Sequence, residues 1–219
     1  MNHDLSVILQ HYTDFLAGLG NTLWLAAATL IVGSLLGCIV AGLLLSPVRI
    51  VQRATSILVD GLRCVPFLLL VYLIYYGLPE LGIRFDRWTA GLSALIIYHT
   101  AYFGEIIRGA WLNVSRDQIE AGRAYGYSGL LLFRRIILPQ LFFSSAPLIG
   151  NQSIYIMKDT AFLMIITIPE LTFAAASIQS TYFVPFASFL AAVLLYWIVT
   201  LAIERGVHRI ELAADLRRA

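Results

Sequence analysis

Charged residues are scarce in this sequence. Lysine, arginine, aspartate and glutamate make up 13% of its 219 residues, whereas hydrophobic residues make up 59%. Soluble domains carry about 25% charged residues, so water cannot be the solvent for most of this surface. The formal net charge is only +2 and the arginines are dispersed, so we expect no nucleic acid partner. The composition predicts a protein embedded in the lipid bilayer.

Cysteine and the usual signatures of enzyme chemistry are also lacking. Cys38 and Cys64 lie in apolar stretches without the number or spacing of a disulfide framework or a metal site, so we expect both to be buried packing residues. The histidines lack metal-ligand spacing, and we expect His99 to be a packed polar residue. The sequence has no G-x-x-x-x-G-K-[ST] phosphate loop. We therefore expect no enzyme activity, no cofactor and no metal.

The N-terminus has no basic region before the first apolar run, so we expect no cleaved signal peptide. Five apolar segments are long enough for a membrane-spanning helix, which needs about 20 residues. The expected crossings lie near residues 18–45, 56–78, 88–108, 142–165 and 186–204. The sequence thus predicts an all-α polytopic membrane protein. Gly33 and Gly37 form a G-x-x-x-G pair, which is either a helix contact or the ordinary glycine content of such helices.

A polar segment at residues 111–140 separates the third and fourth crossings. Ser115 and Gln118 have the spacing of a capping box, which predicts a helix start. Gly126 is suited to ending that helix in the left-handed conformation, and Ser128 can cap a second helix. The segment therefore predicts a short helix, a bend and a second helix, all in water.

The arginines predict the orientation. In an odd number of crossings the two ends lie on opposite sides, and cytoplasmic segments carry the excess of lysine and arginine. Five crossings put the turn with Arg49 and Arg53, the 111–140 segment, and the tail with Arg217 and Arg218 on one side. We expect that side to be cytoplasmic, with the N-terminus outside.

Within the polar segment, Glu120, Ala121, Gly122, Gly126 and Pro139 resemble, at matching spacing, the cytoplasmic EAA loop of permease subunits in bacterial ATP-binding cassette (ABC) importers. Gly122 departs from the alanine that is usual there. Further stretches are similar to the branch that imports polar amino acids. These stretches are Arg63–Phe67 with Gly77–Pro79, Ala101–Ala110, and a spaced set from Leu138 to Thr160.

The resemblance implies a type I ABC importer permease fold, a single transmembrane domain over residues 1–219 and a place in the bacterial cytoplasmic (inner) membrane. It implies four kinds of partner: a second permease subunit, identical or related, two ABC ATPase subunits, an extracytoplasmic substrate-binding protein, and lipid. The EAA loop would act as a rigid lever. The resemblance assigns ATPase coupling to Glu120, Ala121, Gly122, Arg123 and Gly126.

By the same resemblance a central pocket lies between the second and fourth crossings. Its candidate residues are Cys64, Val65, Pro66, Leu148, Asn151 and Tyr155. The usual Gly-Thr of the family is absent at Cys64 and Val65. Since none of these residues is acidic, an amino acid or derivative that is zwitterionic or has a neutral side chain is expected rather than a cationic one.

Charged residues also occur inside the expected crossings, where they are costly unless they face protein or water. They are Asp60, Arg63, Glu105, Arg108, Lys158 and Asp159. The first two pairs are three residues apart and can form ion pairs, whereas Lys158 and Asp159 are adjacent, and we expect both in the bundle interior. At Pro66 a packing kink and a site wall remain open.

Two alternatives to an ABC permease are considered. An ion-coupled secondary transporter would use Asp60, Glu105, Lys158 and Asp159 as relay groups, but no inverted repeat is apparent. A non-transporting membrane scaffold would show no link between solute and ATP turnover.

Overall fold

A computed structural model describes residues 2–215, and side chains are described for residues 4–212. This part of the chain is helical and without strands, which confirms the all-α prediction. Arg217 and Arg218 of the predicted basic tail lie outside the described residues. The α-helices are α1 (Asn2–Gln10), α2 (Tyr12–Leu44), α3 (Arg49–Cys64), α4 (Phe67–Tyr72), α5 (Arg87–Leu112), α6 (Arg116–Ala124), α7 (Gly129–Leu132), α8 (Leu138–Asp159), α9 (Leu171–Tyr182) and α10 (Pro185–Asp215).

Short π and 3-10 turns extend three of these helices. A π turn (Leu73–Gly77) and a 3-10 turn (Leu78–Leu81) follow α4, a π turn (Phe133–Ile137) joins α7 to α8, and a 3-10 turn (Thr160–Ile166) follows α8. The residue before each π or 3-10 turn has helical backbone angles, so the turns continue the helices. The π turn Phe133–Ile137 therefore joins α7 and α8 into one long element.

Four stretches among the described residues are long and apolar enough to cross a membrane: Tyr12–Leu44, Arg87–Leu112, Gly129–Ile166 and Pro185–Leu212. The pair Arg49–Cys64 and Phe67–Leu81 makes a fifth if it is counted as one span, and it is bent by 101°. The bend falls at Val65 and Pro66, whose backbone is extended. Proline removes a helical donor and disfavours helical angles in the residue before it, so the break expected at Pro66 is present.

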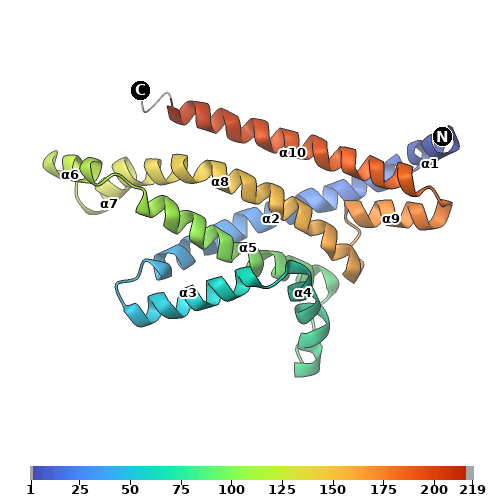
Figure 1. The fold of residues 1–219 in the computed structure, drawn as a ribbon, viewed down its shortest axis with the longest axis horizontal. Helices are drawn as coiled ribbons and strands as arrows, with labels where there is room; N and C mark the ends of the chain where they lie inside the picture. Colours follow the sequence, from blue (N-terminus) through green and yellow to red (C-terminus); the bar gives the residue numbers. More distant parts are fainter. Residues whose placement is uncertain (1, 216–219) are drawn as a thin grey trace.

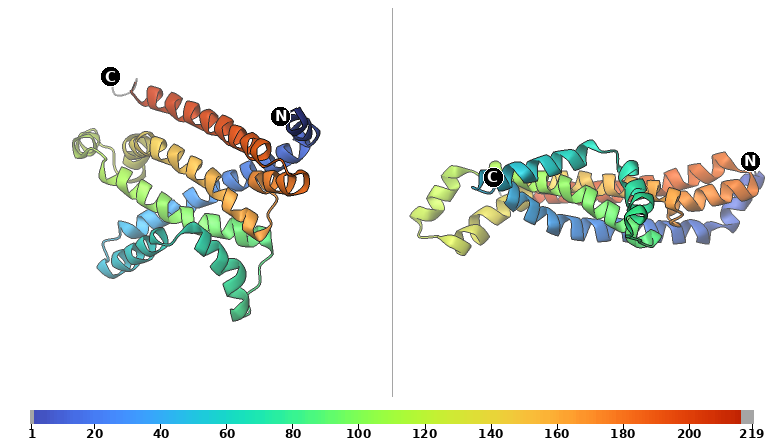
Figure 2. Two further views of the ribbon diagram at one scale, coloured as in Figure 1. Left: turned by 45° about the vertical axis from the view of Figure 1, so that its right-hand side comes forward. Right: turned by 90° about the horizontal axis from the view of Figure 1, so that it is seen from below.

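The long helices are arranged along one axis, and α4 with the turns after it points away from that axis (Figure 1). The N-terminus and α9 lie at one end, while α6, α7 and the turn between α2 and α3 lie at the other. Helix α10 runs alongside α8 and ends toward the end with α6, and the right-hand view in Figure 2 shows the same elongated arrangement. The two ends of the described chain therefore lie at opposite ends of the bundle, as an odd number of crossings requires.

Helices α2 and α5 form the closest pair in the bundle. Gly33 faces the ring of Phe103, and a Cβ added at Gly37 would lie 2.5 Å from the Cβ of Phe103. Gly104 faces Val40 in the same way, so each helix supplies a glycine where the other is bulky. The G-x-x-x-G pair thus serves a helix contact within this chain.

At the end with the N-terminus, a buried carboxylate that the sequence did not single out holds α9 in place. Glu170 is fully buried, and its side chain accepts hydrogen bonds from the backbone N–H groups of Thr172 (2.8 Å) and Phe173 (2.6 Å). The Tyr196 hydroxyl on α10 also donates to it (3.0 Å). Thr22 on α2 accepts the N–H of Leu171 (3.2 Å), so α2, α9 and α10 meet at this point.

Candidate functional site

The break between α3 and α4 leaves Cys64, Val65 and Pro66 exposed on the surface of the chain. Cys38 on α2 is also exposed, so the prediction that both cysteines are buried is wrong. The physical reason is that apolar sequence in a membrane protein need not be covered by its own chain, because lipid or another subunit can cover it.

One face of α8 is left uncovered by the rest of the chain. Leu148, Asn151, Tyr155 and Lys158 are all exposed and follow each other at spacings of three, four and three residues. That spacing keeps them on one helical face. Pro147, which lies inside α8, does not end the helix. The three pocket candidates of the fourth crossing therefore share a face with Lys158.

A buried polar pair connects α5 to α8. The Nδ1 atom of His99 lies 2.7 Å from Nε2 of Gln152, and its Nε2 atom lies 3.4 Å from Oδ2 of Asp159. His99 is fully buried. Sequence reasoning identified His99 as a packed polar residue but missed both partners, because Gln152 and Asp159 are more than fifty positions away in the chain.

This polar pair lies next to the break. The Phe67 ring, directly after Pro66, lies 6.3 Å from the His99 ring and 6.2 Å from the Phe162 ring. On the other side of the break, the Arg63 guanidinium lies 5.3 Å from the centre of the Tyr102 ring. Thus the break, the middle of α5 and the C-terminal end of α8 converge, and the polar groups that accompany them belong to candidate membrane spans.

The six predicted membrane charges have different surroundings. Arg108 and Glu105 form a close ion pair (2.7 Å), and Arg63 and Asp60 form a loose one (3.9 Å). Asp159 faces His99, but Lys158 is exposed, with its amine 6.0 Å from the centre of the Tyr155 ring. Asp159 thus lies against its own chain while Lys158 does not, because neighbours on a helix point about 100° apart, and the expected place of Lys158 in the bundle interior stays a prediction.

At the opposite end from α9, the predicted helix, bend and second helix are present. Ser115 caps α6 by accepting the N–H of Gln118 (3.4 Å), and Gly126 follows α6 with φ +83°. Ser128 makes no side-chain cap, contrary to expectation, and its backbone carbonyl instead accepts the N–H groups of Leu131 and Leu132.

The α6 surface divides the predicted coupling residues into two groups. Glu120, Ala121, Arg123 and Gly126 are exposed, as a docking surface requires. Gly122 is buried instead, and a Cβ there would lie 2.9 Å from Cδ1 of Leu132. Gly122 therefore lets α6 approach its own chain, and its part in ATPase coupling stays a prediction.

The helical segment α6–α7 is anchored to both neighbouring spans. Ala110 at the end of α5 packs in one buried cluster with Leu132, Ile137 and Leu141, the last of which lies in the first turn of α8. By contrast Tyr125, beside the bend, is 85% exposed. Tyr125 therefore adds an aromatic side chain to the exposed surface at the bend, and sequence reasoning missed it.

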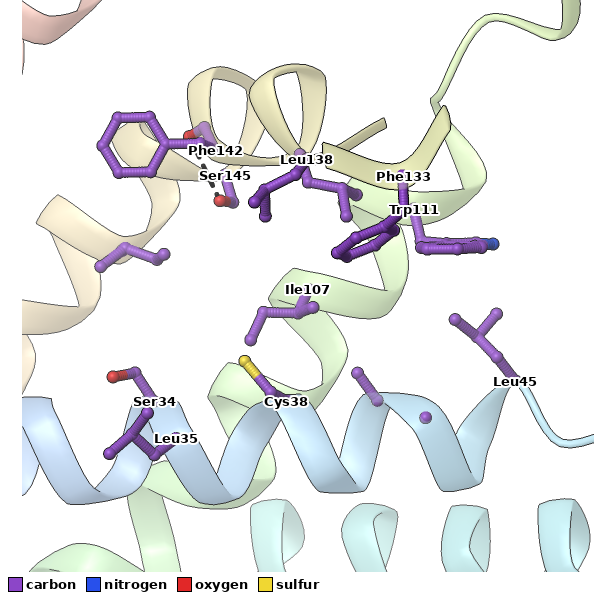
Figure 3. Close-up of a pocket in the computed structure, with 14 residues that line it drawn as sticks. Ser34, Leu35, Cys38, Leu45, Ile107, Trp111, Phe133, Leu138, Phe142 and Ser145 are labelled. Atoms are coloured by element: carbon purple, nitrogen blue, oxygen red, sulfur yellow. Dashed lines mark hydrogen bonds between the residues drawn. The ribbon is translucent and has the colours of Figure 1, made fainter. Parts of the chain in front are cut away.

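A separate cavity of about 560 Å³ lies between α2, the end of α5 and the start of α8. Figure 3 shows its apolar walls, among them Leu35, Ile107 and Phe142, with the hydroxyl groups of Ser34 and Ser145. Its lining has no charged side chain. An amino acid with charged ends would be poorly solvated there, so the polar groups near the break are the better candidate path.

Comparison with known proteins gives a family match and several related permeases. Residues 33–213 match the family described as "Binding-protein-dependent transport system inner membrane component". The chain is 36% identical to the nopaline transport system permease protein NocM of Agrobacterium fabrum, over 93% of this chain and 89% of NocM. It is 31% identical to the probable glutamine ABC transporter permease protein GlnM of Bacillus subtilis, over 95% of this chain and 96% of GlnM.

The fold is similar to that of a chain in the crystal structure of an amino acid ABC transporter with histidines. The TM-score is 0.86 at 30% identity, with 94% of this chain and 96% of the other covered. A chain of the methionine transporter MetNI, at 20% identity and a TM-score of 0.69, shares the fold. The chain therefore belongs to the family of inner membrane components of binding-protein-dependent transport systems.

Proposed function

We propose that this chain is the permease subunit through which an ABC importer moves an amino acid or an amino-acid derivative across the inner membrane. The family supplies the membrane component of such importers, and ATP hydrolysis belongs to a separate subunit. The relatives include permeases named for nopaline and for glutamine, which supports this class of solute.

The proposed path for the solute runs between the break at Cys64–Pro66 and the uncovered face of α8 with Asn151 and Tyr155. The observation that carries this assignment is that polar side chains at membrane depth are left uncovered by their own chain. Such groups require water or protein around them. A second permease subunit, identical or related, would close the path from the other side.

The chemistry of this uncovered face favours a carboxylate-bearing solute. Lys158 supplies an exposed ammonium group on the same face as Leu148, Asn151 and Tyr155, and no acidic side chain lies among these four. An ammonium group binds a carboxylate by charge-assisted hydrogen bonds. A zwitterionic amino acid, or one with a neutral side chain, is therefore the proposed solute class.

The proposed orientation puts the N-terminus and α9 outside and α6 in the cytoplasm. It is supported by the arginines at the α6 end, including Arg49 and Arg53 of α3 and Arg134 and Arg135 before α8. A substrate-binding protein would then meet the end that holds α9. Two ATPase subunits would meet α6 and its counterpart in the second permease.

In this arrangement the exposed side chains of α6 receive the ATPase. Glu120 and Arg123 supply charge, Ala121 allows close approach, and Gly126 shapes the bend. Because α6 is anchored to the ends of α5 and α8, its displacement would tilt both spans as a rigid lever. ATP-driven closure of the ATPases would in this way move the path between its inward-facing and outward-facing states.

The test is a charge reversal at Glu120, with uptake, ATPase co-purification and membrane insertion measured together. Glu120→Lys is expected to lose ATPase association and uptake while insertion is retained. The matched control is Glu80→Lys, an equally exposed carboxylate that the proposed orientation puts outside. Undiminished uptake by Glu120→Lys would overturn the coupling role, and uptake in an ion gradient by the chain without ATPase subunits would support a secondary transporter instead.

A further inference from the structure

Helix α3 differs from the other long helices of the bundle in having three distinct faces. With sixteen residues it is too short by itself to count among the four continuous spans. At about 100° per residue, its sixteen residues divide into a buried sector, an exposed apolar sector and an exposed polar sector. The buried sector packs on α2 and α5, and the rest of this chain leaves the two exposed sectors uncovered.

The buried sector fixes α3 against α2 and α5. Val59 is 2% exposed and packs in one cluster with Leu44 of α2 and Ala101 of α5, with Leu62 partly buried beside them. The apolar sector, by contrast, has nothing of its own chain to cover it. Ile50 and Ile57 are 82% and 67% exposed, as suits a surface against lipid or an apolar subunit.

The polar sector is a continuous stripe along the whole helix. Its members are Arg49, Gln52, Arg53, Ser56, Asp60 and Arg63; Ser56 is half-buried and the other five are exposed. The stripe begins at the α2–α3 turn and ends one residue before Cys64, at the break. A hollow of about 490 Å³ lies against its first two turns. Where such a stripe enters the membrane, it requires water beside it.

The charges of the stripe are unbalanced. Three arginines and one aspartate give it a formal charge of +2. Asp60 accepts a hydrogen bond from Ser56 (3.2 Å) and lies 3.9 Å from Arg63. Among the described residues neither Arg49 nor Arg53 forms an ion pair, so both remain free to attract an anionic group.

We propose that this stripe is the wall of the inner half of the solute path: a water-filled vestibule that leads from the break to the α2–α3 turn and attracts carboxylates. The inference rests on the proposed function and extends it to the half of the path between Cys64 and the cytoplasm. The vestibule raises the local concentration of solutes with a free carboxylate and repels cations, because a positively lined cleft focuses its field.

The test measures the reactivity of single introduced cysteines in the complex with its ATPase. Inside-out membrane vesicles are used, and no nucleotide is added. Ser56→Cys reports the polar stripe, and Ile57→Cys, its neighbour in sequence, reports the apolar sector. A sulfonate-bearing and a trimethylammonium-bearing methanethiosulfonate are the probes, and labelling is read for each peptide by mass spectrometry, so that Cys38 and Cys64 remain in place. Uptake by each variant is measured in parallel.

Ser56→Cys is expected to react about tenfold faster than Ile57→Cys. At Ser56→Cys the anionic probe should react faster than the cationic one, once each rate is divided by the rate of the same probe with a small thiol in solution. The ratio of the two normalised rates does not depend on how much of the Ser56→Cys thiol is ionised. Replacing Arg53 with glutamine should reduce the preference.

An unreactive Ser56→Cys, or an Ile57→Cys that reacts faster, would overturn the vestibule, as would equal reactivity toward the two probes. If uptake and ATPase co-purification persist in those cases, only the vestibule fails. If the unmodified permease inserts normally but shows neither uptake nor ATPase co-purification, the proposed function fails as well.

Discussion

Replacing Glu170 with glutamine tests whether the buried carboxylate is held by hydrogen bonds that only a carboxylate can accept. Three donors converge on it: two backbone N–H groups at the start of α9 and the Tyr196 hydroxyl. Glutamine has one acceptor oxygen and would turn its NH₂ group toward a donor. One buried N–H then loses its partner, which costs about 1–3 kcal/mol.

The assay is thermal unfolding of the purified complex in detergent, with Tyr196→Phe as the control. Tyr196→Phe removes a single donor and leaves the cap of α9 intact, so it should cost about 1 kcal/mol. Glu170→Gln should cost more than the control. If Glu170→Gln is as stable as the unmodified protein near neutral pH, the cost of burying the charge outweighs the hydrogen bonds, and the reasoning is wrong.

The pH dependence has a definite sign. Burial raises the pKa of Glu170, and the hydrogen bonds from Thr172 and Phe173 oppose that rise without cancelling it. The folded protein therefore holds this proton more tightly than the unfolded chain does. The contribution of Glu170 to the free energy of unfolding is greatest below the usual carboxylate pKa and declines as the pH rises through the raised value. Glu170→Gln should remove this dependence.

Four further substitutions give separate expectations. Gly126→Ala forces an alanine into a left-handed conformation (φ +83°) and should cost about 1–2 kcal/mol in unfolding measurements. At Gly122→Ala the side chains of Leu132 and Ile136 must shift to admit the Cβ, which offsets the gain in helix propensity, so the net change should be small. Gly37→Val should destabilise by about 1–3 kcal/mol or more, because Phe103 leaves no room for a Cβ. Lys158→Ala should lower uptake while the ATPase still co-purifies, and unchanged uptake would exclude a solute contact.

Local sequence rules predicted those features that depend on near neighbours. Pro66 acts on the residue before it, Gly126 on its own backbone, and Glu105 on Arg108 one helical turn away. The crossings followed from apolar runs in the same way. These features need no knowledge of which helices are adjacent, so the sequence is sufficient for them.

The features that were missed depend on which elements meet. His99 finds Gln152, and Glu170 finds Tyr196, only because the helices that carry them are neighbours. The motif included Gly122 among the coupling residues, but it does not tell which face of α6 packs on Leu132. Cys64 was expected inside for a related reason, since a subunit that is part of a larger assembly leaves some apolar sequence for other molecules to cover.

The anchoring of α6 has a mechanical consequence for the buried pair between α5 and α8. His99 lies eleven residues from Ala110, and Gln152 lies eleven residues from Leu141, where both helices are fixed to the α6 segment. At 1.5 Å per residue, each arm is about 16 Å long. The two helices are therefore fixed together at the α6 segment and touch again at the His99–Gln152 contact, at equal distances along each helix. A rotation of the α6 segment would therefore reach the histidine and the glutamine together.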